Sequence, residues 1–244
     1  KKANYWMPID MYIGGKEHAC MHLIYFRFYT KFLHDLGLLK FDEPANKLFN
    51  QGMLHKDGVV MSKSKGNVVL PEEVSDKYGI DTGRLFLMFV AGPDKDMEWN
   101  DEAVEGSFRF LNKFYSLLDK KLVNVKDPKQ ESKINKTIKE VTSYIEEFKF
   151  NMAIISLMDM TNYLYSKDVI DKKVLEELVL LMSVFTPHIC EEMWEKLSGK
   201  GFVSLAKWPS FDVSKIDEKA EASEESVSKL ILDISNVLKL ANVE

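Results

Sequence analysis

MYIGGKEHACMHLIYFRFYTKFLHDL, residues 11–36, sets a short apolar run before two glycines and a long stretch without glycine or proline after them. The run Met11–Ile13 predicts a strand, and the stretch from about Glu17 to Leu36 predicts a helix. A second strand-like run covers Lys47–Met53, and a hairpin signal follows it at Asp57-Gly58. Strand, helix and strand in this order indicate part of an α/β unit.

The rest of the chain shows a helical pattern. Pro71, followed by two glutamates, is typical of the first turn of a helix. Asn100-Asp101 favours the start of a longer helix that runs to about residue 123. Further helices are expected at about 81–90, 132–149, 151–166, 171–197 and 227–238. The predicted fold class is therefore mostly α with a small α/β part.

Composition and charge exclude several classes of protein. The 244-residue chain has 33 Lys and Arg against 38 Asp and Glu, so its net charge of −5 gives no overall sign of a nucleic-acid binder. Cys20 and Cys190 lie far apart without a CxxC motif, which excludes a disulfide framework and a cysteine-rich zinc site and favours a reducing compartment. No apolar run approaches the roughly 20 residues that span a bilayer. We therefore expect a cytoplasmic protein without a membrane partner.

The stretch from Met61 to Asn67, MSKSKGN, combines serines, lysines, a glycine and an asparagine just after the hairpin signal. Hydroxyls, ammonium groups and backbone amides are the groups that bind a polyphosphate. The stretch is not a Walker loop, because the spacing of that motif is absent. By composition alone, a solvated Lys/Ser loop is the favoured interpretation, with a polyphosphate-binding loop as the alternative.

The glycine pair and the residues after it form a second candidate site. Gly14-Gly15 allows a ligand to approach the backbone closely where a strand gives way to a helix. Glu17 is placed to accept hydrogen bonds from sugar hydroxyls. On a continuous helix His18 and His22 share one face, but no third ligand is evident nearby, so we expect no metal. A packed or pocket-lining histidine pair is the interpretation retained.

Five strings together resemble the leucyl-tRNA synthetases, a family of class I aminoacyl-tRNA synthetases. They are GGKEHACMHLIYFRF from Gly14, QGM from Gln51, MSKS from Met61, KYGIDTGRLF from Lys77, and the stretch that begins at Glu98-Trp99. The MSKS loop alone fits any class I synthetase, whereas the first string separates the leucine family from its isoleucine, valine and methionine relatives. The resemblance covers nearly the whole chain and is strongest in residues 1–120.

The resemblance implies a division into three parts. Residues 1–70 would be the C-terminal part of a Rossmann-like catalytic domain with the signature loop. Residues 71–100 would be connecting helices of the stem-contact kind, and residues 101–244 an anticodon-binding-type helical bundle. No His-x-x-His signature of the class occurs, and Lys1 is neither an initiator Met nor the start of a signal peptide. We therefore expect a C-terminal portion whose N-terminal half is missing.

The resemblance also assigns roles to the matching residues. Lys63 would be the catalytic cation on the pyrophosphate side of ATP, and His18 and His22 would line the leucine pocket. Val60 stands where the family usually has a lysine, which removes one positive charge from the loop. The implied ATP contacts are Gly14, Gly15, Glu17, Gly52, Met53, Met61, Ser62, Lys63, Ser64 and Lys65.

The activity implied is that of leucine–tRNA ligase, which activates leucine with ATP and Mg²⁺ and transfers it to tRNA(Leu). The partners would be leucine, ATP, tRNA(Leu) and the missing N-terminal half, without which we expect the chain to be inactive. Arg109, Lys113, Lys120 and Lys121 form a candidate tRNA-contacting face, with an ordinary solvated face as the equal alternative. A free-standing tRNA-binding or assembly subunit without ATP chemistry is the alternative function.

Overall fold

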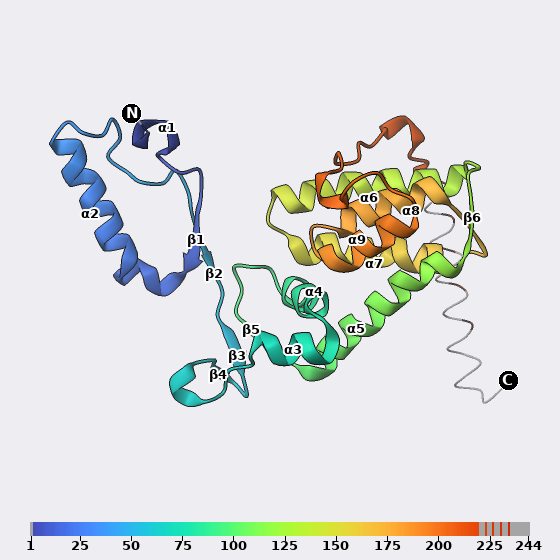
Figure 1. The fold of residues 1–244 in the computed structure, drawn as a ribbon, viewed down its shortest axis with the longest axis horizontal. Helices are drawn as coiled ribbons and strands as arrows, with labels where there is room; N and C mark the ends of the chain where they lie inside the picture. The colour runs from blue at the N-terminus through green and yellow to red at the C-terminus, as the bar shows by residue number, and fades with distance from the viewer. Residues whose placement is uncertain (1, 220–222, 224–225, 227–229, 231–233, 235–244) are drawn as a thin grey trace. The chain divides into compact units, whose positions relative to one another are not determined.

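The computed structural model describes residues 2–219 together with residues 223, 226, 230 and 234 (Figure 1). Apart from two of these positions, the helix expected at 227–238 lies outside the described residues. The chain divides into two compact units, which we call unit 1 (residues 1–73 and 90–101) and unit 2 (residues 74–89 and 102–244). The connecting segment predicted at 71–100 is thus shared between the units, and the chain returns to unit 1 after its first passage into unit 2.

Unit 1 contains the predicted α/β element. After the short helix α1 (Ala3–Trp6), strand β1 (Tyr12–Gly15) is followed by helix α2 (His22–Asp35) and by strand β2 (Leu48–Gln51). The two strands pair in parallel, with β1 and β2 in register from Tyr12 opposite Leu48 onward. The order of strand, helix and strand predicted from the sequence is therefore confirmed.

The single helix predicted from Glu17 to Leu36 is wrong in its first turn. The residues directly after β1 form a 3-10 helix, η1 (Lys16–Cys20), and the chain breaks at Met21, whose φ of −129° and ψ of −102° are not helical. The tighter 3-10 turn reverses the chain within a few residues of the end of the strand. Nothing in the composition of this glycine- and proline-free stretch marks the break.

A hairpin follows β2, as the Asp57-Gly58 signal predicts. Strand β3 (Leu54–Lys56) pairs antiparallel with β4 (Val59–Val60) and parallel with β5 (Met97–Glu98). Both turn residues have positive φ, 57° at Asp57 and 72° at Gly58, which is the conformation that a two-residue hairpin turn requires. The short 3-10 helix η2 (Lys63–Lys65) follows β4.

The remaining helices make up most of unit 2. They are α3 (Pro71–Tyr78), α4 (Ile80–Val90), α5 (Asp101–Tyr115), α6 (Pro128–Glu146), α7 (Phe150–Tyr165), α8 (Lys172–Met182) and α9 (Pro187–Lys196). The 3-10 turns η3 (Ser116–Asp119), η4 (Val203–Leu205) and η5 (Val213–Lys215) are short, and strands β6 (Lys121–Val123) and β7 (Val169–Asp171) pair in parallel. No helix among the described residues is long and apolar enough to cross a membrane.

Two of the predicted helices are shorter than expected. The helix predicted to run to residue 123 ends at Tyr115, because the following residues form η3 and then β6. The helix predicted at 171–197 is two helices, since Pro187 has no N–H for an internal helix bond and instead begins α9. The mostly helical fold class with a small α/β part is confirmed.

The core of unit 2 is continuous across its helices. Phe114, Leu157, Leu178 and Met193, from four different helices, are fully buried and belong to one apolar cluster. Burying side chains of this size removes about 25 cal/mol of unfavourable hydration for each Å² of apolar surface, which is the main force that holds such a bundle together. The helical spacing of apolar residues therefore marks packing, as the sequence predicts.

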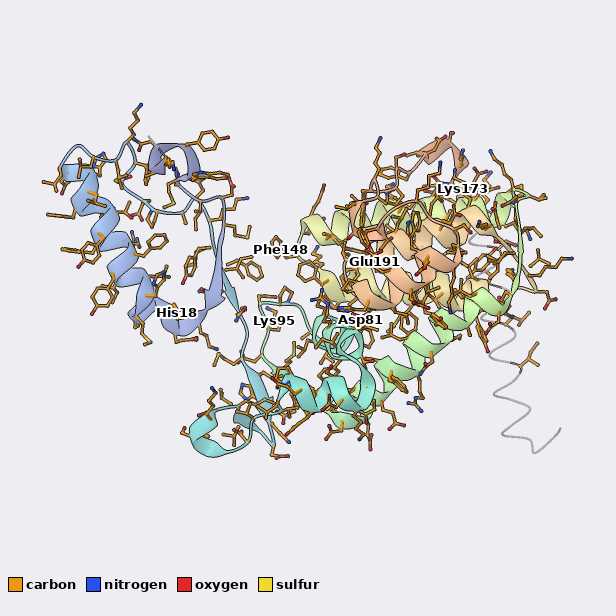
Figure 2. The ribbon with its side chains drawn as sticks, in the orientation of Figure 1. His18, Asp81, Lys95, Phe148, Lys173 and Glu191 are labelled. Carbon is orange, nitrogen blue, oxygen red and sulfur yellow. The ribbon has the colours of Figure 1, made fainter. Side chains whose placement is uncertain are left out.

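Helix α4 is fixed to the bundle by two charged side chains, Asp81, which is labelled in Figure 2, and Arg84. At the start of α9, Asp81 accepts hydrogen bonds from the Ile189 amide (2.8 Å) and contacts His188 Nδ1 (2.9 Å). At the end of α8, Arg84 donates to the carbonyls of Phe185 (3.0 Å) and Val184 (3.2 Å). An anion at a helix N-terminus and a cation at a C-terminus are both favourable for the helix dipoles.

Candidate functional site

The two glycine-containing segments predicted to contact ATP lie side by side. Gly15, the last residue of β1, stands opposite Gln51, the last residue of β2, and Gly52-Met53 follow directly. Parallel strands of an α/β sheet bind ligands at their carboxyl ends. A Cβ at the buried Gly15 would overlap the carboxylate of Glu17, so this predicted contact residue folds back over the strand end.

The backbone of Gly52-Met53 is held by a segment from much later in the chain. The Gly52 amide donates to the Pro93 carbonyl (2.9 Å), and the Met53 amide donates to Asp96 Oδ1 (2.7 Å). A Cβ added to Gly52 would overlap the carbonyl of Lys95. Contact between an adenine ring and Met53 would therefore not use the Met53 amide hydrogen, because it is already bonded to Asp96.

The signature loop begins next to these residues. The amide of Met61 donates to the carbonyl of Leu54 (2.9 Å), the residue that follows Met53. Lys63, Ser64 and Lys65 are exposed at the surface of the loop. The loop predicted from MSKSKGN thus starts beside the predicted adenine segment and presents its lysines to solvent.

Hydrogen bonds within the loop fix its shape. Asn67 accepts from the Ser62 amide (2.9 Å) and donates to the carbonyls of Val59 and Val60 (3.3 and 3.4 Å). The hydroxyls of Ser62 and Ser64 lie 2.7 Å apart. Asn67 therefore links the end of the loop to β4. It is not among the predicted site residues, although it is the last residue of the predicted string MSKSKGN.

His18 and His22 are neighbours, but not for the reason predicted. They lie on different elements, His18 in η1 and His22 at the start of α2, with ring centroids 6.1 Å apart. The ring of His22 stacks on Tyr12 and Phe26, with centroids 5.6 and 5.3 Å away. His18 Nδ1 is buried and has no hydrogen-bond partner among the described residues. The pair therefore presents one unsatisfied buried nitrogen beside the end of β1.

No metal site is evident near these histidines. Within the part of the chain that the structure describes, no group of three or more His, Cys, Asp or Glu side chains is placed to hold a metal ion. Cys20, between the two histidines in sequence, is exposed.

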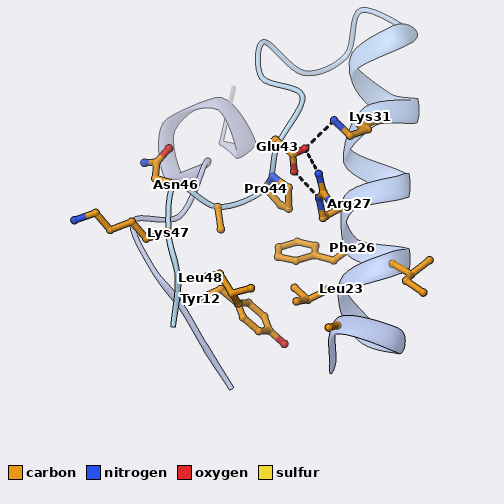
Figure 3. A pocket seen from close by; sticks show the side chains of 13 residues that line it. Tyr12, Leu23, Phe26, Arg27, Lys31, Glu43, Pro44, Asn46, Lys47 and Leu48 are labelled. Carbon is orange, nitrogen blue, oxygen red and sulfur yellow. Dashed lines mark hydrogen bonds and ion pairs between the residues drawn. The ribbon is translucent and has the colours of Figure 1, made fainter. Parts of the chain in front are cut away.

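A pocket of about 630 Å³ lies between α2 and the segment that leads into β2 (Figure 3). On one wall Glu43 accepts two hydrogen bonds from Arg27 (2.6 and 2.9 Å) and pairs with Lys31 (2.8 Å). The hydrogen bonds from Arg27, and then that from Lys31, lower the pKa of Glu43 to about 2. Tyr12 and Phe26, which stack on His22, also line the pocket. Sequence reasoning missed Glu43, because no motif marks it.

The predicted basic face is divided in the structure. Arg109 and Lys121 are exposed, whereas Lys113 donates to Asn162 Oδ1 (2.7 Å) and lies 4.6 Å from the ring centroid of Tyr165. Lys120 lies over the same ring at 4.9 Å. Two of the four cations therefore contact α7, and no pattern in the sequence points to Tyr165 as their shared aromatic partner.

Two family models match the chain. The model described as tRNA synthetases class I (I, L, M and V) matches residues 1–100, and the model described as anticodon-binding domain of tRNA ligase matches residues 127–243. The chain belongs to the class I tRNA synthetases. Strands β1 and β2 and the signature loop of unit 1 lie within the class I match, and the described helices from α6 onward lie within the anticodon-binding match.

Relatives within the class I synthetases are leucine–tRNA ligases. Those of Fervidobacterium nodosum and Thermotoga maritima are 46% and 44% identical to this chain, each over 88% of it. The chain spans 29% of the length of these curated relatives.

Solved structures show the same fold. The agnB2 LeuRS of Agrobacterium radiobacter, in a ternary complex with tRNA and LeuAMS, superposes with a TM-score of 0.78 at 34% identity, over 88% of this chain and 30% of that one. A Mycobacterium tuberculosis methionyl-tRNA synthetase bound by methionyl-adenylate superposes with a TM-score of 0.60 at 18% identity, over 78% of this chain and 44% of that one, and shows the fold alone.

Proposed function

We propose that this chain supplies part of the ATP site and the anticodon-binding helices of a leucine–tRNA ligase. The observation that carries the proposal is the meeting of three segments in unit 1. Gly14-Gly15 end β1, Gly52-Met53 directly follow the neighbouring parallel strand β2, and the signature loop starts at Met61, bonded to Leu54. The leucine–tRNA ligases among the relatives supply the amino acid and the tRNA of the proposal.

The reaction has two steps. A carboxylate oxygen of leucine attacks the α-phosphorus of ATP, the bond to pyrophosphate breaks, and leucyl-adenylate forms. A hydroxyl of the terminal adenosine of tRNA(Leu) then attacks the leucyl carbonyl carbon, and AMP leaves. Positioning and positive charge carry most of the catalysis of phosphoryl chemistry. The Lys63 ammonium supplies charge at the departing pyrophosphate, and Mg²⁺ enters with ATP as part of the substrate.

The surface of α2 supports a larger catalytic domain around it. Its residues Ile24, Tyr25, Phe28, Tyr29 and Phe32 are 48–67% exposed. Apolar residues on several sides of a helix are typical of a helix buried in a protein core. We infer that other parts of a full-length synthetase, including the N-terminal half of its catalytic domain, cover α2 and complete the ATP site.

The bundle of unit 2 is the proposed tRNA(Leu)-binding part. Its match to an anticodon-binding model supports this role, and Arg109 and Lys121 are exposed cations on it. Because Lys113 and Lys120 contact Tyr165, phosphate contacts by these two would have to compete with cation–π interactions. The cytoplasm is the proposed location, since its reducing conditions suit two unpaired cysteines.

Leucine-dependent exchange of labelled pyrophosphate into ATP tests the proposed function. We expect the full-length protein that contains this chain to catalyse the exchange with leucine, and the 244-residue chain alone to show only background. Exchange that depends on methionine, isoleucine or valine instead would contradict the amino-acid assignment. Binding of tRNA without any amino-acid-dependent exchange by the full-length protein would favour the alternative of a tRNA-binding or assembly subunit.

The histidine pair tests the leucine pocket. In the full-length protein we expect His18→Ala or His22→Ala to raise the KM for leucine. The same substitutions should reduce the selectivity for leucine over isoleucine and valine. A misfit the size of one methylene is worth only about 1–3 kcal/mol, so the selectivity for leucine should fall by roughly 10- to 200-fold at most. The KM for ATP should change less.

Exchange kinetics with each amino acid measure this effect. The matched control is His34→Ala, at the exposed end of α2, the helix that begins at His22. It should leave the KM values for leucine, isoleucine and valine unchanged. Unchanged selectivity combined with a lower melting temperature would show a packing role instead. A stoichiometric metal that is lost on either substitution would show a metal site.

A further inference from the structure

The segment from Gly92 to Trp99 has no assigned role, yet it contacts two of the parts proposed to bind ATP. It is where the chain returns to unit 1 after α4, and its residues Met97 and Glu98 pair as β5 with Leu54 and His55 of β3. The Met97 amide also donates to the Met53 carbonyl (3.0 Å). The strand therefore runs alongside the residues that follow the proposed adenine segment.

Asp96 is the charged centre of this segment. Its Oδ1 accepts a hydrogen bond from the Met53 amide (2.7 Å) and lies 3.5 Å from Lys16 Nζ, and its Oδ2 lies 3.8 Å from His55 Nε2. The bond from Met53, and then the charge of Lys16, hold the pKa of Asp96 below its usual range. The side chain is therefore a carboxylate at neutral pH.

These contacts join both glycine-containing segments. Lys16 directly follows Gly14-Gly15, and Met53 belongs to the segment that follows β2. One carboxylate thus contacts a residue from each of the two strand ends that are proposed to hold adenosine. A hydrogen bond to a charged acceptor is shorter and about twice as strong as one between neutral groups, so this contact is suited to fixing backbone.

Glu98 makes a similar contact with the hairpin. Its Oε1 accepts from the amide of Gly58 (3.1 Å), in the turn between β3 and β4. The signature loop follows β4 directly. The same short strand therefore carries one acidic side chain to the strand ends and a second to the turn that precedes the loop.

We propose that Asp96 is a positioning residue of the ATP site, which holds Gly52-Met53 and the end of β1 at the separation that adenosine requires. This inference rests on the proposed function. Asp96 acts through the Met53 amide and the Lys16 ammonium, and Glu98 supports it by holding the hairpin turn. Its loss leaves the Met53 amide without its acceptor and lets the adenine segment move away from β5.

The inference predicts a selective effect on ATP. In the full-length protein we expect Asp96→Ala to raise the KM for ATP by roughly 10- to 100-fold, since a displacement of about 1 Å is enough to cost two orders of magnitude. The KM for leucine should stay within about twofold, because Asp96 bonds to Met53 and Lys16 and makes no hydrogen bond or ion pair with His18 or His22 in the described part of the chain. Asp96→Asn keeps an oxygen that accepts from the Met53 amide and should restore much of the ATP affinity.

Pyrophosphate exchange at varied ATP and leucine, together with hydrogen exchange at the Met53 amide, tests the inference. The matched controls are Asp94→Ala and Asp94→Asn, which remove the same charge two residues earlier, where Asp94 pairs with Lys95 (3.0 Å). We expect the Met53 amide to exchange faster in Asp96→Ala than in the wild type or in either control. If Asp96→Ala fails to fold, Asp96→Asn is compared with Asp94→Asn: the loss of the Lys16 charge pair should leave the KM for ATP of Asp96→Asn above that of Asp94→Asn, and equal KM values overturn the inference.

Four results are decisive. An unchanged KM for ATP in Asp96→Ala overturns the inference, and so does a fall in kcat alone, which is what partial unfolding produces. Equal changes in the KM of ATP and of leucine overturn it as well. A wild-type protein without leucine-dependent pyrophosphate exchange overturns the proposed function instead. In that case, faster hydrogen exchange at the Met53 amide in Asp96→Ala still supports the positioning contact.

Discussion

Replacing Lys63 by alanine in the full-length protein is expected to reduce the rate of leucyl-adenylate formation by roughly 10²- to 10³-fold, the usual cost of losing one preorganised charge-stabilising group. Lys63 is exposed in η2, and its ammonium has no partner among the described residues. It is therefore free to contact the departing pyrophosphate. Leucine affinity should change little, because the charge acts at the far end of ATP.

Single-turnover adenylation measures this loss, with Lys65→Ala as a companion and Lys40→Ala as the control. Because Val60 stands where the family usually has a lysine, Lys63 and Lys65 share the remaining charge of the loop, and Lys65→Ala should also lower the rate. Lys40 is an exposed lysine between α2 and β2, and its removal should have no effect. A near-normal rate in Lys63→Ala would show that the loop is assigned wrongly.

Gly52→Ala is expected to have the second large effect, a fall of roughly 10²-fold in kcat/KM for ATP, as for a misplacement of about 1 Å. The added Cβ would overlap the carbonyl and amide groups of Lys95 and Asp96, which are backbone and cannot rotate away. The Gly52-Met53 segment must then separate from the segment Gly92 to Trp99 and stretch the bond from Gly52 to Pro93 (2.9 Å).

Gly106→Ala provides the control for the glycine substitution. Gly106 lies in α5, where an added Cβ meets nothing within 4 Å, so alanine there should stabilise the protein by about 0.5–1 kcal/mol. Exchange kinetics at varied ATP and thermal melting of both variants make the comparison. A Gly52→Ala variant with the wild-type KM for ATP would mean that this close approach does not shape the nucleotide site.

Local signals in the sequence were sufficient for several elements. The Asp57-Gly58 hairpin has the two left-handed residues that its turn needs, and Pro71 begins a helix as its fixed φ favours. The single helix predicted across Pro187 is wrong for a reason that is also local, since proline in a helix interior is itself a breaking signal. The break at Met21 is different, because no residue type there marks it.

The candidate site could be predicted only in part. Motif strings placed Gly14-Gly15, Gly52-Met53 and the signature loop in one site, and the structure brings these segments together in unit 1. Their contacts with ATP remain a prediction. Asp96 could not be found in this way, because it is 43 residues from Met53 and no periodic pattern links the two.

By itself, the sequence determined the order of the elements, the helical nature of the second part and the family, since turns, caps and apolar spacing act over a few residues and the motif strings are contiguous. Only the tertiary structure decided which groups are already committed: the Met53 amide to Asp96, the ammonium of Lys113 to α7, and the ring of His22 to Tyr12 and Phe26. The physical reason is that such contacts join residues distant in sequence, and they form only when the folded chain brings donor and acceptor within hydrogen-bonding or van der Waals distance.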